Sequence, residues 1–86
     1  MRIAFLQMNV HFGDKARNLD KIKTMVARKK AELYVFPELC TTGYLFASRQ
    51  EAVKMAECIP SGPSCDKLAA LARRHNCFLV AGIAEK

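Results

Sequence analysis

The chain has 86 residues, with a hydrophobic fraction of 51%, a charged fraction of 26% and a formal net charge of +6. This length suggests one domain at most, and the apolar fraction argues against disorder. No apolar run reaches the roughly 20 residues of a membrane span, and Gln7 interrupts the opening apolar stretch too soon for a signal peptide. We therefore expect a cytoplasmic protein with no membrane partner.

The positive charge raises nucleic acid as a possible partner. Seven of the fourteen Lys and Arg residues fall between Lys15 and Lys30. They interleave with Leu19, Ile22 and Val26, a spacing typical of a helix with one buried stripe and a solvated basic face. No aromatic residue stands among them to stack on bases. We predict no nucleic-acid partner. Binding through this helix is the weakest alternative and would show as salt-dependent retention on DNA or heparin.

The cysteines and histidines show no metal-binding pattern. They are Cys40, Cys58, Cys65, Cys77, His11 and His75. No two cysteines form a C-x-x-C pair and no histidine stands at ligand spacing, so no metal site is predicted. Cysteines of a cytoplasmic chain stay reduced, and we expect all four to pack as small hydrophobic residues. Both histidines are expected in turns or at the surface.

The first half of the chain predicts two strands with a helix between them. Residues Ile3–Met8 are rich in apolar and β-forming residues. After a turn, a helix is expected from about Asn18, as its N-cap, to Lys29. Leu33–Phe36 is a short, continuous apolar strand, and Pro37 ends it because proline cannot donate to a sheet ladder.

The second half predicts two helices and a last strand. Ser48, with Glu51 three residues later, is the signature of a capping box at the start of one helix. A breaker rich in Pro and Gly precedes a further helix, which Ser64 is expected to cap. Asn76 suits the left-handed position after that helix. The run Cys77–Ile83 is continuously apolar and has strand character.

The expected order is therefore β-α-β-α-α-β, with strands that are apolar rather than alternating. Such strands are typical of a parallel sheet buried on both faces, within an α/β layered fold. Three short helices barely cover two faces of a sheet. The chain also reaches Lys86 with no covering element after the last strand. We therefore expect an incomplete domain.

Glu38 follows the second expected strand almost immediately. In open α/β sheets, ligands bind outside the carboxyl ends of the strands. An acid this close to an apolar strand is costly unless it is paired or functional. From the residues alone, a functional carboxylate is about as good an interpretation as a structural one, such as an ion pair or a helix cap.

A wider set of short motifs shifts that balance. In chain order they are Ile3-Ala4 with Gln7-Met8, Gly13-Asp14 with Asn18, Ala31-Glu32-Leu33, Phe36-Pro37-Glu38-Leu39 with Thr42-Gly43-Tyr44, Pro60-Ser61-Gly62-Pro63, and Val80-Ala81-Gly82-Ile83-Ala84-Glu85. Each fragment is weakly specific, but the ordered set covers essentially the whole chain. It resembles the N-terminal segment of the nitrilase superfamily of carbon–nitrogen hydrolases.

The resemblance implies that residues 1–86 are part of a nitrilase-like α-β-β-α sandwich with a Glu-Lys-Cys catalytic set and no metal or organic cofactor. The glutamate deprotonates the cysteine, which attacks an amide or nitrile carbon, and the lysine stabilises the developing charge. Only the catalytic glutamate matches this sequence, as Glu38. Lys86 comes too early to be the lysine, and Cys40 matches no nucleophile position. Tyr44 and Glu85 are implied as supporting residues.

The resemblance also implies a small-molecule amide or nitrile substrate and a homodimer. The chain alone is expected to be inactive, because it lacks the lysine and the cysteine of the set. The alternative is a protein of another class, a stand-alone α/β module that binds or assembles without catalysis. A reading frame continuing beyond Lys86 into that lysine and cysteine would favour the enzyme. The motifs do not separate amidases from nitrilases, carbamoylases or amide synthases.

Overall fold

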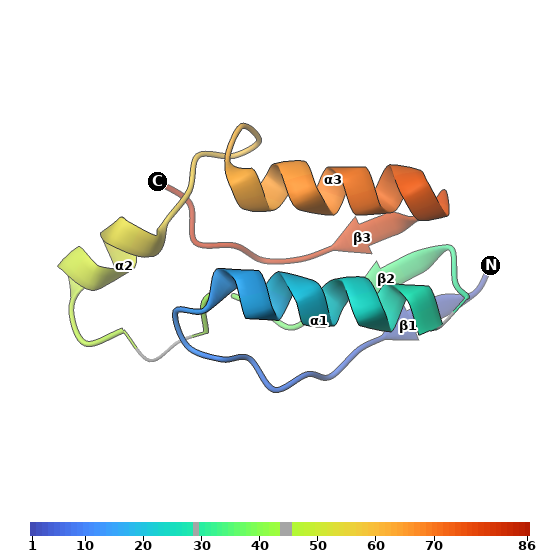
Figure 1. Cartoon of the computed structure of the whole chain (residues 1–86), viewed down its shortest axis with the longest axis horizontal. Helices are drawn as coiled ribbons and strands as arrows, with labels where there is room; N and C mark the ends of the chain where they lie inside the picture. Colours follow the sequence, from blue (N-terminus) through green and yellow to red (C-terminus); the bar gives the residue numbers. More distant parts are fainter. Residues whose placement is uncertain (29, 44–45) are drawn as a thin grey trace.

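The computed structural model describes residues 1–28, 30–43 and 46–86 (Figure 1). The strands are β1 (Ile3–Phe5), β2 (Leu33–Val35) and β3 (Phe78–Val80), and the helices are α1 (Lys15–Arg28), α2 (Arg49–Met55) and α3 (Pro63–His75). They follow one another as β1, α1, β2, α2, α3 and β3. An α/β chain with three strands and three helices is therefore confirmed. Within the described ranges, none of the helices has the length and apolar character needed to cross a membrane.

The three strands form one parallel sheet in the order β1-β2-β3, as their apolar character predicts. Each has three residues, so all three are shorter than expected: β2 by one residue, and β1 and β3 by more. The last ladder bonds run from the Leu6 N–H to the Val35 carbonyl and from the Phe36 N–H to the Val80 carbonyl, both at 2.9 Å. Pro37 follows on the central strand and has no N–H to donate, so the pairing of β2 with β1 ends there.

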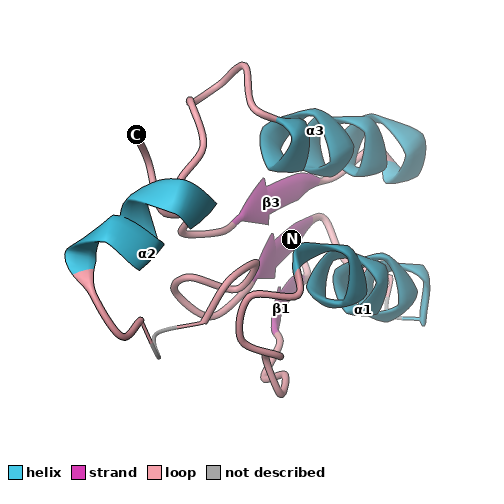
Figure 2. Ribbon diagram, turned by 60° about the vertical axis from the view of Figure 1, so that its left-hand side comes forward, coloured by secondary structure: helices cyan, strands magenta, loops and turns pink. Residues whose placement is uncertain are grey.

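Helices α1 and α3 lie side by side on one face of the sheet, whereas α2 lies beyond the ends of the strands (Figure 2). Ile22 and Val26 of α1 and Leu71 of α3 are buried against Tyr34 at the centre of β2. The Tyr34 hydroxyl donates a hydrogen bond to the Val26 carbonyl at 3.3 Å. The hydrophobic core lies between this pair of helices and the sheet.

The opposite face of the sheet is bare, which corrects the expectation that the strands are buried on both faces. Phe5 is 77% exposed and Phe78 70% exposed, and Ile3 and Val80 are also about half exposed, at 47% and 51%. Side chains alternate between the faces of a strand, so these residues point away from the two covering helices. The sheet lacks a second layer within the described residues, because both long helices pack on the same side.

Helix α1 begins earlier than the sequence suggests. The Asp14 carboxylate accepts a hydrogen bond from the Arg17 N–H at 3.1 Å, and the helix starts at Lys15. The prediction that Asn18 is the N-cap is therefore wrong. Asn18 lies within the first helical turns, fully buried. Both residues are good N-caps in isolation, so local preference cannot choose between them.

The other helix ends agree in part with the predictions. Ser48 caps α2 and accepts a hydrogen bond from the Glu51 N–H at 3.1 Å, as expected. Asn76 is left-handed after α3, with φ of 51° and ψ of 55°, which is also confirmed. The prediction that Ser64 caps α3 is wrong: the N-cap is Gly62, with Pro63 as the first helical residue.

Candidate functional site

The loops that follow the three parallel strands gather at one end of the molecule, together with α2 and the C terminus (Figure 1). Glu38 lies in the loop after β2, at this carboxyl edge of the sheet. Its side chain is exposed, and its carboxylate forms no hydrogen bond or ion pair with any residue that the structure describes. The carboxyl edge of the strands is where open α/β sheets bind ligands, so Glu38 lies at the expected place for a candidate site.

The turn that carries Glu38 has a strained backbone. Leu39 has a φ of +52°, the left-handed region that costs a non-glycine residue about 1 kcal/mol or more. The Leu39 carbonyl accepts hydrogen bonds from the N–H groups of Thr42 at 3.3 Å and Gly43 at 2.8 Å, which close the turn. The residue after Glu38 is thus the strained position of this turn.

Gly82 lies directly against Glu38, beyond the end of β3. A Cβ atom on Gly82 would stand 3.3 Å from Cγ and 3.4 Å from Cα of Glu38, and 3.5 Å from the Leu39 nitrogen. The absence of a side chain on Gly82 therefore lets the two segments approach. A glycine just after a strand can mark such a close approach, and this signal was present in the sequence.

Asn18 connects the same turn to helix α1. Its Nδ2 group donates to the Thr41 carbonyl and to the His11 carbonyl, and its Oδ1 accepts from the His11 N–H, each at 2.8 Å. A further bond runs from the Gly13 N–H to the Thr42 carbonyl at 2.9 Å. The loop after β1 and the loop after β2 are thus joined by a fully buried side chain and by a backbone hydrogen bond.

An open hollow lies beside this region, where β1 and β2 end. Its volume is about 440 Å³, and Gln7, Met8, Asn9 and Pro37 line it. Pro37 directly precedes Glu38 in the chain, but Glu38 itself is not one of the lining residues. The Gln7 and Asn9 side chains add amide donors and acceptors at its edge.

Glu57 is a second acidic residue at this end of the molecule, and sequence reasoning missed it. Its carboxylate accepts hydrogen bonds from both the N–H and the hydroxyl of Ser64, and it forms an ion pair with Lys15 at 2.8 Å. Burial alone would raise the pKa of the Glu57 carboxyl, but the hydrogen bonds from Lys15 and Ser64 and the Lys15 charge together lower it. A buried carboxylate with all these partners is structural: it caps α3 and ties it to α1.

The supporting residues implied by the resemblance have different outcomes. Tyr44 lies outside the described residues. Glu85 is exposed; its backbone forms a parallel bridge with Glu57, and its carboxylate has no hydrogen-bond partner within the described ranges. The structure therefore gives Glu85 a backbone role beside the end of β3 and brings its side chain to no partner.

The cysteines are all free of disulfides. Cys40 lies in the hydrophobic core, and burial raises the pKa of its thiol, so its predicted packing role is confirmed. Cys65 and Cys77 are half-buried, and burial also raises the pKa of each thiol. Cys58 is exposed, so the prediction that it packs is wrong. Raised pKa values make the first three thiols poor nucleophiles at neutral pH.

The histidines lie where they were expected, in a turn and at the surface. The His11 carbonyl accepts a hydrogen bond from the Asp14 N–H at 3.1 Å, and partial burial, then the charges of Arg17 and Lys21, lower the pKa of its imidazole. His75 is exposed at the end of α3. Over the three described ranges, no group of three or more His, Cys, Asp or Glu side chains could hold a metal ion.

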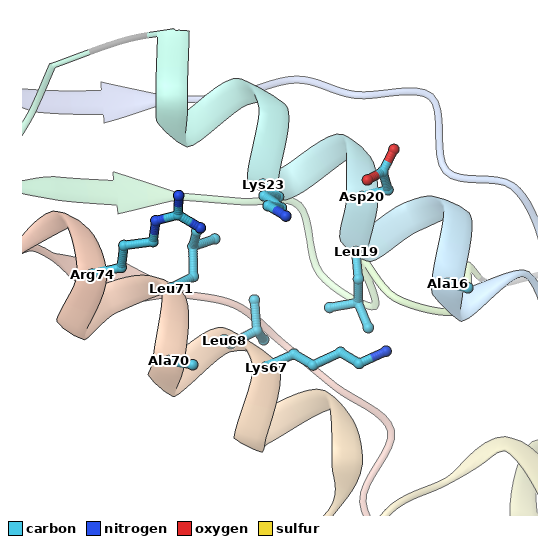
Figure 3. A pocket seen from close by; sticks show the side chains of 9 residues that line it. All are labelled: Ala16, Leu19, Asp20, Lys23, Lys67, Leu68, Ala70, Leu71 and Arg74. Atoms are coloured by element: carbon cyan, nitrogen blue, oxygen red, sulfur yellow. The ribbon is translucent and has the colours of Figure 1, made fainter.

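A separate groove of about 400 Å³ lies between α1 and α3, on the outside of the helix layer (Figure 3). Leu19, Leu68 and Leu71 contribute apolar surface, and Lys23 and Arg74 are among its cations. Only helix residues line it, and none of the residues around Glu38 does. The groove is therefore not the site that the acidic turn defines.

The fold and the site together define an α/β protein with an exposed acidic side chain beyond the central strand of a parallel sheet. The sequence model of the carbon-nitrogen hydrolase family matches residues 2–86, and the chain belongs to this family. It is 35% identical to a nitrilase of Pyrococcus abyssi (strain GE5 / Orsay) over 100% of this chain and 34% of that protein. It is 23% identical to a protein N-terminal amidase of Saccharomyces cerevisiae (strain ATCC 204508 / S288c) over 99% of this chain and 20% of that protein.

The resemblance to the N-terminal segment of the nitrilase superfamily is thus confirmed. The chain spans about a third of the length of the first of these relatives and a fifth of the length of the second.

Proposed function

We propose that this chain is the N-terminal segment of a carbon–nitrogen hydrolase that acts on small amides or nitriles, and that Glu38 is its general base. One observation carries the proposal: in a chain of this family, Glu38 is an exposed carboxylate with no partner among the described residues, just beyond the central strand. A general base must reach the proton it removes at hydrogen-bond distance. A carboxylate already held in a structural ion pair could not do so.

In the proposed reaction Glu38 removes the proton from a cysteine thiol, and the thiolate attacks the amide or nitrile carbon. A lysine stabilises the negative charge that develops on the substrate oxygen or nitrogen. In an amide the carbon–nitrogen bond then breaks, and the leaving amine takes the proton that Glu38 removed from the thiol. In a nitrile, water adds to the thioimidate and ammonia leaves. Both routes give an acyl-enzyme, which is hydrolysed to the free acid and thiol by a water molecule that Glu38 deprotonates. Both the lysine and the cysteine would come from residues beyond this segment. Cys40 is not this nucleophile, because it is fully buried in the core.

The bare face of the sheet supports the same interpretation of the fold. Large apolar side chains on one open face, Phe5 and Phe78 above all, are unusual on a monomer and mark a surface that another layer covers. In an α-β-β-α sandwich this layer is a second sheet, packed face to face on the first. We propose that residues beyond this segment supply it. The homodimer and the cytoplasmic location stay predictions from the sequence.

The same apolar face favours one alternative, a stand-alone α/β module that binds a partner through it without catalysis. The two proposals predict different reading frames in the gene. A reading frame that continues through a lysine and a cysteine supports the hydrolase, whereas a stop after Lys86 supports the module. They also differ in activity, because the module never hydrolyses an amide or nitrile, in any assembly.

The decisive test compares Glu38→Gln with wild type in the complete protein that contains this segment. Acylation in single turnover should fall by about two orders of magnitude or more, because the proton acceptor is lost. The melting temperature should hardly change, because the Glu38 carboxylate has no structural partner in the described chain. Glu38→Asp should also lose most activity, since its carboxylate retreats by one methylene.

Glu32→Gln is the matched control. Glu32 precedes β2 as Glu38 follows it, and among the described residues its carboxylate accepts one hydrogen bond, from the Arg2 N–H at 3.3 Å, on the exposed surface. This variant should keep both its activity and its melting temperature. A stable Glu38→Gln protein with full activity would refute the proposed role of Glu38. A Glu38→Gln protein that melts much earlier but turns over normally when folded would make Glu38 structural.

A further inference from the structure

Asn18 is a buried polar side chain that the proposed chemistry does not use. It is fully buried in α1, and its amide forms three hydrogen bonds at 2.8 Å, two with the backbone of His11 and one with the Thr41 carbonyl. A side-chain amide offers two donors and a carbonyl acceptor, so both of its ends are in use. Burying so polar a group is costly unless it is hydrogen-bonded, and these three bonds offset that cost.

The Thr41 carbonyl belongs to the turn that carries Glu38. This turn begins at Glu38, contains the left-handed Leu39 and closes with the bond from the Gly43 N–H to the Leu39 carbonyl. The Thr41 hydroxyl is buried with no hydrogen-bond partner among the described residues. The Thr41 side chain therefore does not tie the turn through a hydrogen bond of its own, and the backbone contacts do so.

A strained turn persists only where its surroundings determine its conformation. Two hydrogen bonds from other segments hold the Thr41–Thr42 part of the turn: the bond from Asn18 to the Thr41 carbonyl, and the bond from the Gly13 N–H to the Thr42 carbonyl at 2.9 Å. Asn18 supports the second contact as well. Gly13 lies in the loop that Asn18 holds by both backbone groups of His11. One side chain thus orders both loops.

We propose that Asn18 is a positioning residue for Glu38: it holds the Glu38 turn against the loop after β1 and so fixes where the carboxylate points. The inference rests on the proposed function, because it concerns the general base of that reaction. Asn18 touches no reacting atom itself. A displacement of about 1 Å in a catalytic group costs up to about 100-fold in rate, so loosening this turn should slow catalysis without removing the carboxylate.

The test uses Asn18→Asp in the complete hydrolase. Aspartate keeps the oxygen that accepts the His11 N–H but loses the donors to the two carbonyls. We expect kcat to fall by about 10- to 100-fold with KM little changed, since the loss affects the chemical step. Hydrogen exchange of the Gly43 and Gly13 amides should accelerate. Asn76→Asp, the same substitution at the exposed end of α3, is the control and should change none of these.

A double variant separates positioning from general stability. If Asn18 acts through Glu38, then Asn18→Asp together with Glu38→Gln should be about as slow as Glu38→Gln alone, because the carboxylate that Asn18 positions is gone. Independent effects would multiply instead and would overturn the inference. Asn18→Ala repeats the test without a buried charge, in case Asn18→Asp does not fold. If neither variant folds, Asn18 is a residue of the core and the inference is wrong.

The outcomes also distinguish the inference from the function on which it rests. Activity that falls with Glu38→Gln but survives both Asn18 variants would refute the positioning role and leave the hydrolase proposal intact. Full activity of Glu38→Gln would refute the proposed base, and the positioning role with it.

Discussion

Glu57 and Ser64 form the most tightly bonded side-chain pair in the described part of the molecule. The Glu57 carboxylate accepts the backbone N–H of Ser64 at 2.7 Å and its hydroxyl as well. Lys15, at the start of α1, completes the group. Gly62 has to be a glycine for this arrangement, because a Cβ atom there would lie 2.8 Å from Oε1 of Glu57 and 2.7 Å from the Cys58 carbonyl oxygen.

Glu57→Gln should therefore destabilise the protein by about 1–3 kcal/mol, because one amide group cannot accept from Ser64 and pair with Lys15 as the carboxylate does. Urea unfolding followed by circular dichroism measures this. Glu85→Gln is the matched control, since Glu85 is exposed and its side chain has no described partner. The control should change the free energy of unfolding by about 0.5 kcal/mol or less. Equal effects of the two variants would contradict a structural role for Glu57.

The same carboxylate should make stability depend on pH. The folded-state pKa of Glu57 is lowered from its ordinary value of 4.5. The ionised group then stabilises the fold fully above about pH 4.5, and this contribution is lost as the pH falls through the folded-state pKa. The difference in unfolding free energy between wild type and Glu57→Gln should be constant from about pH 7 to pH 5.5 and shrink below 4.5. A difference that grows in acid would contradict this assignment.

The structure also indicates which features were predictable from local sequence. Pro37 marked the end of β2, and Glu38 could be placed at the carboxyl edge of the sheet because an apolar parallel strand precedes it. The N-cap of α1 could not be predicted from the sequence, because Asp14 and Asn18 are equally good caps. Asn18 is withdrawn into the core by its bond to Thr41, 23 residues away. Contacts of this kind are tertiary and leave no local pattern.

Glu57 was missed for a related reason. Its partner Ser64 lies beyond the Pro- and Gly-rich breaker, so the carboxylate caps the helix from outside any capping motif. The burial of the strands was mispredicted because apolar runs indicate two covered faces but not what covers them. Here the α1 and α3 layer covers one face, and Phe5 and Phe78 occupy the other.

The bare face should make the 86-residue chain self-associate, because exposed apolar surface of this kind recruits a second layer. Sedimentation velocity at several concentrations should show reversible oligomers. A Phe5→Thr/Phe78→Thr variant should shift the population toward monomer. A dilute monomer of high stability in the wild type would mean that the face needs no partner.

A matched pair of valines tests which surface mediates the self-association. Val80 is 51% exposed on the bare face, and Val53 is 53% exposed on α2. Val80→Thr should weaken association, whereas Val53→Thr should not, although both remove the same apolar area. If Val53→Thr has the larger effect, association occurs through α2 rather than through the sheet.

Gly82→Ala should slow catalysis in the complete hydrolase while leaving the fold intact. Gly82 is not among the glycines with positive φ, so alanine meets no backbone strain there, and the new methyl group acts only through its neighbours. It would stand 3.3 Å from Cγ of Glu38, closer than ordinary van der Waals contact, and would displace the carboxylate by a few tenths of an ångström. We expect kcat to fall by about 10-fold or more, with a small change in melting temperature.

Gly62→Ala supplies the opposite pattern in the same assay. Its Cβ atom would lie 2.7 Å from the Cys58 carbonyl oxygen and would also crowd Glu57, neither of which takes part in the proposed reaction. The overpacking should destabilise the fold by about 1–3 kcal/mol and so lower the melting temperature. Its folded fraction should retain the wild-type kcat. The two glycine variants therefore separate stability from rate. If Gly82→Ala lowers only the melting temperature, as Gly62→Ala does, then Gly82 packs against the turn without controlling the position of Glu38.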